Sequence, residues 1–478
     1  MTSGLTPVTA SFITDYNFRA VLYIISFSLF IYGLSGLTGP KTAVRGNRIA
    51  AVGMGIAVIA TLLVPDVNNI FLIILGVAIG TAVGVPAARQ VKMTQMPQMV
   101  ALFNGVGGGA VALIAWVEFR ESGGFAEVPT YVAIFSCFAA IVGSVSFWGS
   151  NIAFGKLQEL IDGGSKVIGT AQIQSLINVA LGAVAVACGV AIVAGSHSEI
   201  LIIGILVSSA LLGVFLVLPI GGADMPVVIS LLNAFTGLSA AATGVALNNT
   251  SLIVAGMIVG ASGTLLTQQM AVAMNRSITS VIAGGFGGTV EAAAGATSAS
   301  GGTVRSTSAA DVAIQMAFAR LVVVVPGYGM AVSQAQHAVR EMAKLLEAKG
   351  VEVKYAIHPV AGRMPGHMNV LLAEADVPYD QLKEMDDING EFPRVDVSLV
   401  IGANDVTNPD ARNKADSPIY GMPILNVDDS ASVIVLKRSM SSGYAGIDNP
   451  LFVNPKTSML FGDAKGSVSA ITEELKAL

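Results

Sequence analysis

Two glycines in the stretch from Arg320 to His358 could bring a peptide backbone close to a phosphate group. Five apolar residues, Leu321 to Val325, are followed by Pro326-Gly327-Tyr328-Gly329-Met330-Ala331-Val332. This fits the Gly-x-Gly-x-x-Gly turn of dinucleotide-binding folds, with valine in the third glycine position. In such turns the first glycine permits the turn, and the second lets the backbone approach a pyrophosphate at a helix N-terminus. The alternative is a glycine turn in an α/β domain that binds no nucleotide.

The residues after this turn have the spacing of a helix that leads into a second strand. Gly350 suits the position just past a helix end, and residues 351–357 are again mostly apolar. Helical spacing relates Val332, Ala335, Val339, Met342 and Leu346. The sequence therefore predicts a strand–helix–strand unit around the glycine turn, which is the context that such a motif requires.

Three more motifs come directly after predicted strands, where ligands bind in open α/β sheets. They are Ala361-Gly362-Arg363-Met364-Pro365-Gly366 after 351–357, Gly402-Ala403-Asn404-Asp405-Val406 after 397–401, and Lys437-Arg438-Ser439 after 433–436. We expect the four loops to meet at one edge of a parallel sheet and to form a nucleotide site. Two alternatives stay open. Lys437 and Arg438 could end a strand in solvent, and Asp405 could form an Asx turn before a helix that starts at Asn408-Pro409.

The sequence favours NADP over NAD as the nucleotide. NAD-binding folds usually have an acidic residue about 20 residues after the glycines, where it binds the ribose hydroxyls. Here the second strand ends at His358-Pro359, and no Asp or Glu follows before Glu374. Arg363 and the Lys437-Arg438-Ser439 cluster offer charge-assisted hydrogen bonds that suit a 2′-phosphate.

Most of the chain ahead of these motifs is too apolar for a soluble domain. The 478 residues are 53% hydrophobic and 12% charged, with a mean hydropathy of +0.71, whereas soluble domains carry about 25% charged residues. Residues 1–310 hold 11 Lys/Arg and 10 Asp/Glu, while residues 311–478 hold 15 and 21. A lipid-embedded part is therefore followed by a water-facing one. We expect no nucleic-acid partner, and the spacing of the histidines predicts no metal site.

Uncharged runs long enough to cross a bilayer, about 20 residues each, recur along the first part. We predict nine spans, at 20–38, 48–65, 70–88, 97–117, 130–150, 173–194, 199–219, 225–246 and 251–271. Glycines four residues apart, as in Gly76, Gly80 and Gly84 and again in Gly256 and Gly260, predict close helix contacts.

The basic residues of the loops predict which way the spans are oriented. An odd number of spans puts the two termini on opposite sides. The side of the C-terminal domain carries Lys41, Arg45, Arg48, Arg89, Lys92, Lys156, Lys166 and Arg276. Because cytoplasmic loops are rich in Lys and Arg, we expect a multi-pass protein of the cell (inner) membrane with its C-terminal domain in the cytoplasm.

Few polar groups lie in or beside the spans, and three of them are candidates for proton transfer. Asp224 is the only charged residue between Glu199 and Arg276, and a lone carboxylate at a span boundary is a functional candidate. It could equally be the N-cap of the helix that starts at Met225-Pro226. Asn233 follows on the same helix, in a polar, small stripe with Ser230 and Gly237. Asn104 in the fourth span is its predicted partner.

The chain divides into three parts. Residues 1–276 form the predicted membrane domain, and residues 277–319, rich in Gly, Ala, Ser and Thr, form a flexible linker. Residues 320–478 form the predicted nucleotide domain. The expected fold is thus a polytopic α-helical membrane domain of about nine helices, followed by a Rossmann-like α/β domain with a parallel sheet.

With these residues in place, the chain resembles the β-subunit family of proton-translocating NAD(P) transhydrogenase over nearly its whole length. In the membrane part the markers are Thr94-Gln-Met-Pro-Gln-Met-Val100, Gly221-Gly-Ala-Asp-Met-Pro-Val-Val228, Ala273-Met-Asn-Arg-Ser277 and Ser280-Val-Ile-Ala-Gly-Gly-Phe286. In the soluble part they are residues 326–332, 358–363, Gly366-His-Met-Asn-Val370, 402–405, Lys437-Arg-Ser-Met440 and Leu460-Phe-Gly-Asp-Ala-Lys465, and the last of these adds Asp463 and Ala464 to the expected nucleotide contacts.

The resemblance implies that the soluble domain binds NADP(H) and meets an NAD(H) domain on a separate α subunit, with direct hydride transfer between the nicotinamides. It implies that NADP lies flipped, with its 2′-phosphate on Lys437, Arg438 and Ser439. Arg363 would contact the nucleotide, Tyr444 would belong to a lid, and Asp405 would lie near the nicotinamide. Asp224 and Asn233 match membrane positions that the family uses in proton coupling. A dimer of the αβ assembly in membrane lipid is expected.

The chain departs from the family pattern in the fourth span. Many members have a histidine where this sequence has Asn104, and no other histidine lies inside a predicted span. We therefore expect the α subunit, which would add further membrane helices, to supply a titratable group, unless water and Asp224 suffice. From a different class, the alternative function is a solute or ion transporter gated by a nucleotide-sensing domain, which would have several polar groups at the bilayer midplane.

Overall fold

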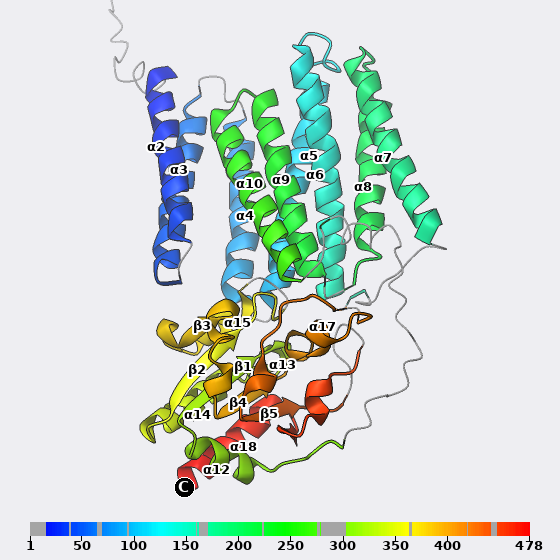
Figure 1. The fold of residues 1–478 in the computed structure, drawn as a ribbon. Helices are drawn as coiled ribbons and strands as arrows, with labels where there is room; N and C mark the ends of the chain where they lie inside the picture. The colour runs from blue at the N-terminus through cyan, green and yellow to red at the C-terminus, as the bar shows by residue number, and fades with distance from the viewer. Residues whose placement is uncertain are drawn as a thin grey trace, which may run out of the picture.

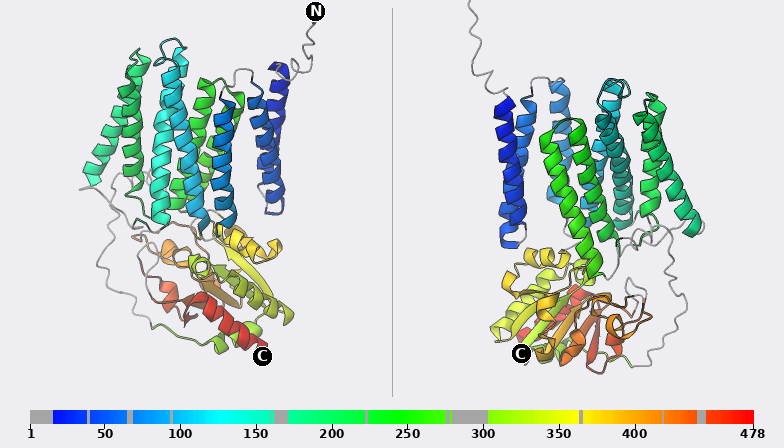
Figure 2. Two further views of the ribbon diagram at one scale, coloured as in Figure 1. Left: turned by 180° about the vertical axis from the view of Figure 1, so that it is seen from behind. Right: turned by 45° about the horizontal axis from the view of Figure 1, so that its top comes forward.

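The computed structural model describes residues 16–37, 40–64, 69–92, 95–158, 160–161, 171–221, 224–274, 278, 303–362, 366–417, 419–440 and 447–478. A set of long helices forms the first part, and an α/β domain lies at one end of them (Figure 1). The same arrangement is seen from behind and with the top tilted forward (Figure 2). We call this end of the helices the domain side.

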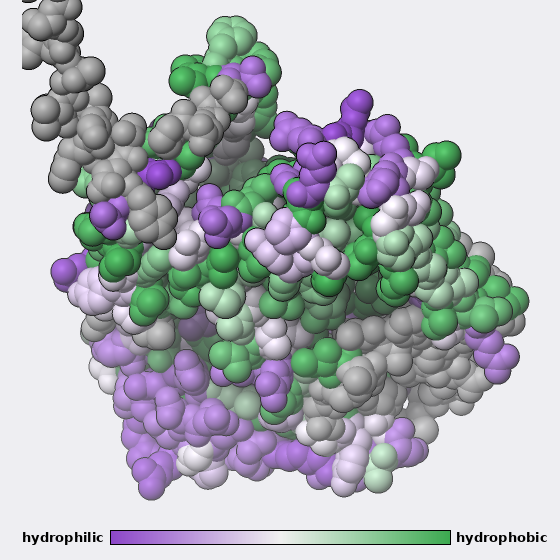
Figure 3. Space-filling model, turned by 90° about the horizontal axis from the view of Figure 1, so that it is seen from above, coloured by the Kyte–Doolittle hydropathy of each residue, from purple (hydrophilic) through white to green (hydrophobic). Residues whose placement is uncertain are grey.

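Nine helices in the described ranges are long and apolar enough to cross a membrane. This confirms the predicted number. Many large apolar side chains of these helices are exposed, as lipid contact requires. Seen from above, onto the helix ends, hydrophobic surface lies between hydrophilic patches (Figure 3). The helices are α2 (Tyr16–Gly36), α3 (Pro40–Leu62), α4 (Ile70–Gln90), α5 (Met96–Glu121), α6 (Thr130–Leu157), α7 (Ala171–Val193), α8 (Glu199–Val217), α9 (Met225–Ala246) and α10 (Thr250–Ala273).

Consecutive helices alternate in direction, so the turns after α2, α4, α6 and α8 lie on the domain side (Figure 1). The predicted basic residues belong to the helix ends and turns on this side. Arg45 and Arg48 are in the first turns of α3, Arg89 and Lys92 close α4, and Lys156 is near the end of α6. Lys166 and Arg276 fall outside the described residues.

Small residues set the closest helix contacts. A methyl group on Gly237 of α9 would lie 2.4 Å from the main-chain nitrogen of Gly260 on α10, and one on Gly108 of α5 would lie 2.9 Å from the Gly143 carbonyl oxygen of α6. These helices therefore touch backbone to backbone. Among the described residues, α4 behaves differently. It has no buried residue, and nothing lies within 4 Å of the space beside its predicted contact glycines Gly76, Gly80 and Gly84.

The C-terminal domain is built on a six-stranded, all-parallel sheet in the order β3-β2-β1-β4-β5-β6. This confirms the predicted parallel α/β domain, and it is the strand order of dinucleotide-binding folds. The order reverses between β1 and β4, and a crevice forms at such a point. The strands are β1 (Leu321–Pro326), β2 (Glu352–Ile357), β3 (Leu382–Glu384), β4 (Val397–Ile401), β5 (Ser432–Lys437) and β6 (Thr457–Phe461).

Both faces of the sheet are buried, which explains the continuous apolar strands. Val322 and Val324 of β1 pack into one core together with α12 (Ala309–Ala317), α14 (Gln336–Ala348), α15 (His367–Glu374) and α18 (Ala464–Ala477). Val323 and Val325 point into the other core, which is closed by α16 (Met385–Ile388) and by the short turns η3 (Phe392–Arg394), η5 (Val427–Asp429) and η6 (Pro450–Val453).

Residues 303–319, within the range predicted as linker, belong to the α/β domain. Ser306 forms a parallel bridge with Met459 of β6, and the Thr307 N–H donates to the Met459 carbonyl at 3.0 Å. Helix α12 follows, with Val312, Ala313 and Met316 fully buried. The ordered domain thus extends back to residue 303. Residues 279–302 of the predicted linker lie outside the described residues.

Candidate nucleotide site and membrane polar cluster

The loops after β1, β4, β5 and β6 are joined in series by main-chain hydrogen bonds at the carboxyl edge of the sheet. The N–H groups of Gly327 and Gly329 donate to the carbonyls of Ile401 and Gly402, at 2.9 and 3.0 Å. The Gly402 N–H donates to the Leu436 carbonyl at 3.2 Å, and Gly462 donates to Lys437 at 3.1 Å. The structure therefore brings these predicted motifs together at one edge.

The glycines of the β1 turn also make contacts that the sequence did not predict. A Cβ on Gly327 would lie 2.4 Å from the main-chain nitrogen of Ala403, and one on Gly402 would lie 2.3 Å from the Cα of Gly329. Gly327 itself is extended, with φ −129°, so a turn is not what requires it. These glycines let the β1 and β4 loops touch main chain to main chain. Gly402 also has a φ of +64°, which favours glycine.

The helix predicted after the turn is interrupted. Residues Tyr328–Val332 form the short helix α13, and Gln334 has a φ of +51° before α14 begins. Met330 and Ala331 are fully buried, main chain included, whereas Val332 is 49% exposed and leaves the predicted apolar face. Beyond the break, Gly350 (φ +87°) follows α14 as predicted.

The β4 loop offers an unused hydrogen-bond donor. Asn449 donates from Nδ2 to the main-chain and side-chain oxygens of Asn404, at 3.0 and 3.1 Å. The Nδ2 of Asn404 is buried and has no hydrogen-bond partner in the described part of the chain. Asp405 opens the short turn η4 (Asp405–Thr407), and the Asx turn at this place is made by Asn408, whose Oδ1 accepts from the Asp410 N–H at 3.0 Å.

Lys437, at the end of β5, is half-buried beside an aromatic ring. Its Nζ lies 4.5 Å from the ring centre of Phe452. Burial lowers the pKa of Lys437, and the nearby Asp405 and Asp448 oppose that shift. Arg438 and Ser439 follow and are exposed. The end of β5 thus presents cationic groups at the same edge as the glycine loops.

The loop after β2 reaches this edge through His358. Its Nδ1 accepts from the Val360 N–H at 3.3 Å, and its Nε2 lies 2.8 Å from the Pro423 carbonyl, which fixes a neutral ring. Burial lowers the pKa of His358. Gly362 has a φ of +108° and packs against His367, Ala361 is buried and Gly366 has a φ of +68°. The predicted contacts Arg363, Met364, Pro365 and Tyr444 lie outside the described residues.

Two other predicted contacts lie after β6. Asp463 caps α18, because its side chain accepts from the Gly466 N–H at 3.2 Å. Ala464 is buried. In the β4 loop, Ala403 is buried and the half-buried Val406 packs against the core.

In the membrane part, hydroxyl groups connect three helices. Asn104 of α5 donates from Nδ2 to the Oγ of Ser150 at 2.9 Å and to the Oγ of Ser146 at 3.4 Å, both on α6. Ser146 Oγ in turn lies 2.6 Å from Thr236 Oγ1 on α9. We call Asn104, Ser146, Ser150 and Thr236 the polar cluster. Within the described residues, Asn104 is therefore bonded to α6 rather than to its predicted partner Asn233.

Asp224 and the stripe on α9 lie at the domain side of the same helix. Asp224 takes the N-cap position of α9, but its side chain makes no capping hydrogen bond. Ser230 accepts from Thr267 on α10 at 3.0 Å, so this part of the stripe faces α10. The buried Lys156 of α6 donates to the Leu218 and Ile220 carbonyls, just ahead of Asp224. The turn that carries Asp224 is thus tied to the end of α6.

Comparison with known proteins decides between the two functional classes. A family model described as NAD(P) transhydrogenase beta subunit matches residues 19–474. The NAD(P) transhydrogenase subunit beta of Rhodospirillum rubrum is 48% identical over 467 residues, which cover 96% of this chain and 99% of the relative. The chain belongs to the NAD(P) transhydrogenase β-subunit family. It is thus a subunit of an enzyme that uses NAD(H) and NADP(H), and the transporter alternative is not favoured.

Several polar groups at the nucleotide site and in the membrane part of this transhydrogenase β subunit were not predicted from the sequence. Asn449 is one, because nothing in its local pattern links it to Asn404, 45 residues away. The hydroxyls of the polar cluster are others, and here a signal existed. Ser146 and Ser150 are four residues apart in an uncharged span, which places them on one helix face. The family name also implies an α-subunit partner.

Proposed function

We propose that this β subunit binds NADP(H) in the crevice between β1 and β4, while the α subunit binds NAD(H). The observation that carries the proposal is the contact of Gly327 and Gly329 with the β4 loop, at the point where the strand order reverses. We expect a nucleotide phosphate to lie against this surface of main-chain groups. The unused Asn404 Nδ2 supplies a donor for a polar ligand at the same place.

The residues at the end of β5 fit a 2′-phosphate. Lys437 is half-buried with the charges of Asp405 and Asp448 nearby, and the exposed Arg438 and Ser439 follow it. A phosphate would take charge-assisted bonds from both cations. The end of β2 carries His358 in place of an acid that would bind the ribose hydroxyls of NAD, which supports NADP.

Bound NADP(H) supplies the hydride chemistry, and the chain's own residues orient it. We assign Asp405, which begins η4 beside the crevice, to the nicotinamide end as a candidate link to protonation. Its negative charge acts on Lys437 across the same site. Protonation of Asp405 would weaken that interaction. The affinity for NADP(H) and the protonation of Asp405 are therefore linked, and each changes the other by the same factor.

We propose that the polar cluster and Asp224 form this chain's part of the proton path. Hydroxyl groups both donate and accept, so Ser146 and Thr236 can pass a proton between α6 and α9. Neither Asn104 nor these hydroxyls titrates near neutral pH, so the titratable groups are Asp224 and a residue of the α subunit. Asn233 lies one helical turn before Thr236 and belongs to the same proposal.

The energetic reason for coupling is that hydride exchange between the two nucleotides is nearly balanced. One charge that moves down about 100 mV supplies about 2.3 kcal/mol, roughly 50-fold in an equilibrium constant. Proton movement must therefore change the affinity of the α/β domain for NADPH or for NADP⁺. In Figure 1, α15 and α17 (Asp410–Asn413), which follow β2 and β4, lie on the side of the domain that faces the helices.

The partners and the orientation complete the proposal. We propose that the unburied helix α4 receives membrane helices of the α subunit, since no described residue of this chain lies beside its contact glycines. The basic residues on the domain side support a cytoplasmic α/β domain. The proposed assembly is a dimer of αβ units in the cell (inner) membrane. We propose a membrane domain at residues 1–276, a linker that begins at 277 and an NADP(H) domain at 320–478, to which the packing of residues 303–319 adds the second part of the predicted linker.

The test uses the αβ complex in sealed vesicles. NADPH should reduce an NAD analogue with proton movement across the membrane in the wild type, and Asp224→Asn should abolish that movement. Glu199→Gln, at the start of α8, is a control because it removes a carboxylate from the side away from the domain. Wild-type hydride transfer without proton movement would refute the coupling. Proton movement that survives Asp224→Asn would remove Asp224 from the path.

A further inference from the structure

Lys156 is a buried lysine in the last turn of α6, and the functions proposed above give it no role. A lysine at the end of a membrane span ordinarily extends toward the membrane surface, where its ammonium group meets water. The sequence predicts this arrangement for a basic residue on the domain side. The structure differs, because Lys156 is only 3% exposed. A buried ionisable group at the edge of the membrane is a functional candidate.

The ammonium group of Lys156 is bound to the end of another helix. Its Nζ donates to the Ile220 carbonyl at 2.8 Å and also to the Leu218 carbonyl. Leu218 is the C-cap residue of α8. The last carbonyls of a helix have no partner within it and carry the partial negative charge of the helix dipole. They are therefore suitable partners for a buried ammonium group.

The turn that Lys156 binds also holds the main chain of Asp224. The Asp224 N–H donates to the Gly221 carbonyl, and the Asp224 carbonyl accepts from the Val228 N–H, both at 3.1 Å. Ile220 and Met225 are buried in the same core. Asp224 itself is half-buried. The backbone on both sides of this carboxylate is thus fixed.

These hydrogen bonds also limit the distance between the two charged residues. Lys156 Nζ lies 2.8 Å from the Ile220 carbonyl oxygen, and the carbonyl oxygen of the next residue lies 3.1 Å from the Asp224 nitrogen. Because adjacent Cα atoms are about 3.8 Å apart, the Asp224 main chain is within about 11 Å of the ammonium group. Two unit charges about 10 Å apart, at an effective dielectric constant of about 20, shift each other's titration midpoint by about one pH unit.

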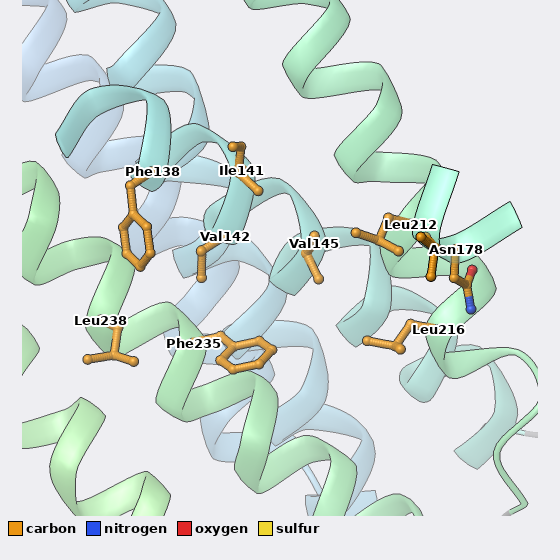
Figure 4. A pocket seen from close by; sticks show the side chains of 10 residues that line it. Phe138, Ile141, Val142, Val145, Asn178, Leu212, Leu216, Phe235 and Leu238 are labelled. Atoms are coloured by element: carbon orange, nitrogen blue, oxygen red, sulfur yellow. The ribbon is translucent and has the colours of Figure 1, made fainter. Parts of the chain in front are cut away.

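Few other described charges lie near this pair. The remaining charged residues of α5 to α10 are at the helix ends away from the domain, and they are Glu118, Arg120, Glu121 and Glu199. Four charged residues of the domain-side loops lie outside the described residues, namely Glu159, Asp162, Lys166 and Arg276. Toward the bilayer centre, α6, α7, α8 and α9 line a groove without a charged residue, and Leu216 of this groove is two residues before Leu218 (Figure 4). Such apolar surroundings screen the pair weakly.

We propose that Lys156 is a positioning residue for the proton step of Asp224. Its ammonium group holds the turn between α8 and α9 against α6, and its positive charge favours the ionised carboxylate of Asp224. Ser150 of the polar cluster lies on α6 as well, about 9 Å along the axis from Lys156. Lys156 thus fixes Asp224 relative to the polar cluster. This inference rests on the role proposed above for Asp224.

The experiment measures the protonation of Asp224 in the αβ complex in sealed vesicles. A hydrophobic carbodiimide adds to protonated carboxyl groups, so mass spectrometry of the Asp224 peptide gives the pH midpoint of labelling. Lys156→Met removes the charge and the donor at nearly constant volume. Lys156→Gln removes the charge but keeps a donor, and Lys156→Arg keeps both. Lys92→Met is the matched control, because it removes an equal charge from an exposed residue just past α4.

The midpoint should rise by about one pH unit in Lys156→Met and Lys156→Gln, because the carboxylate loses a favourable charge. It should stay at the wild-type value in Lys156→Arg and in Lys92→Met. The alkaline limb of proton-coupled turnover should shift by the same amount, and it replaces the labelling midpoint if Asp224 labels too weakly to titrate. Lys156→Gln decides if Lys156→Met fails to assemble.

An unchanged midpoint in the neutral variants would overturn the proposal, even if their turnover were slower, because Lys156 would then serve only as a structural bond. An equal rise in Lys156→Arg or in Lys92→Met would overturn it as well. Labelling requires no turnover. The result is therefore separate from the Asp224→Asn test, which asks whether Asp224 belongs to the proton path at all.

Discussion

Replacement of Gly402 by alanine should separate the two loops that form the crevice between β1 and β4. The new Cβ would lie 2.3 Å from the Gly329 Cα, whereas approaches under 3.0 Å essentially never occur, so the loops must move apart by about 0.7 Å. This shift breaks the hydrogen bond from Gly329 N–H to the Gly402 carbonyl, which is worth about 1 kcal/mol. The left-handed φ of +64° adds roughly 1–2 kcal/mol of strain.

Gly350→Ala separates the two effects. Gly350 has a similar φ of +87°, but nothing lies within 4 Å of the added methyl group, so this variant is destabilised by backbone strain alone. Only Gly402→Ala should move the two loops. A displacement of about 1 Å can cost roughly 100-fold in rate, so hydride transfer to the NAD analogue should fall on that order in Gly402→Ala and remain near wild type in Gly350→Ala.

Two measurements on the purified αβ complex check this reasoning. Calorimetric titration gives the affinity for NADPH, and stopped-flow absorbance gives the rate of hydride transfer. The affinity for NADH on the partner subunit should not change in either variant. If Gly402→Ala binds NADPH and transfers hydride as well as Gly350→Ala does, then contact between the two loops does not shape the nucleotide site.

Three other perturbations test separate parts of the molecule. The double variant Lys437→Ala/Arg438→Ala should weaken NADPH binding about 10- to 100-fold, from the loss of charge-assisted bonds, but leave NADH binding intact; equal losses measured by calorimetry would contradict the phosphate assignment. Ser146→Ala interrupts the link between α5 and α9 and should slow proton-coupled turnover about tenfold. Ser144→Ala, which removes a hydroxyl that donates to the Leu206 carbonyl on α8, should not slow it. A similar rate for both variants in sealed vesicles would exclude the polar cluster from the path. Burial lowers the pKa of His358 below its ordinary 6.5, so the unfolded chain binds that proton more readily, and the stability conferred by the neutral ring is complete above about pH 6.5 and decreases as the pH falls below it. The midpoint of thermal unfolding should therefore decrease on acidification more in the wild type than in His358→Gln, and parallel decreases would speak against this.

The membrane helices could be predicted because bilayer thickness imposes a length on apolar runs. Their ends were harder to place. Helix α6 continues to Leu157, beyond the predicted end at 150, and α3 begins at Pro40 rather than at 48. In both cases the extra turns carry polar residues, such as Asn151 and Arg45, that a hydrophobicity criterion excludes. A helix can extend past the hydrocarbon region wherever its polar side chains find water or protein.

In the α/β domain, long buried strands were predictable and marginal ones were not. Four of the strands could be recognised because most of their residues are apolar, and the loops after them were therefore located correctly. Strand β3 has only three residues, with Lys383 at its centre, and β6 begins with Thr457-Ser458, so neither stands out. Pairing with β2 and β5 defines them as strands, and pairing between segments far apart in sequence has no local signal.

The details of the site depend on contacts that no local pattern contains. The spacing of Gly327 and Gly329 predicted a turn near phosphate, but the sequence could not reveal that these residues meet Gly402 and Ala403, about 75 residues later. Likewise, Asn104 could be recognised as a buried polar group, but its partners are set by how α5 packs on α6. Small residues at Gly108 and Gly143 allow that close packing.

The bridge between Ser306 and β6 has a practical meaning for work on the isolated α/β domain. A recombinant fragment that starts at Arg320 would lack residues 305–307, and the main-chain groups along one side of β6 would face water as a template for other chains. It would also lack α12, which leaves an apolar surface on α18 where Met316 packs. Such a fragment would self-associate. A fragment that starts at Thr303 keeps residues 305–307 on β6 and α12 on α18, and it stays soluble.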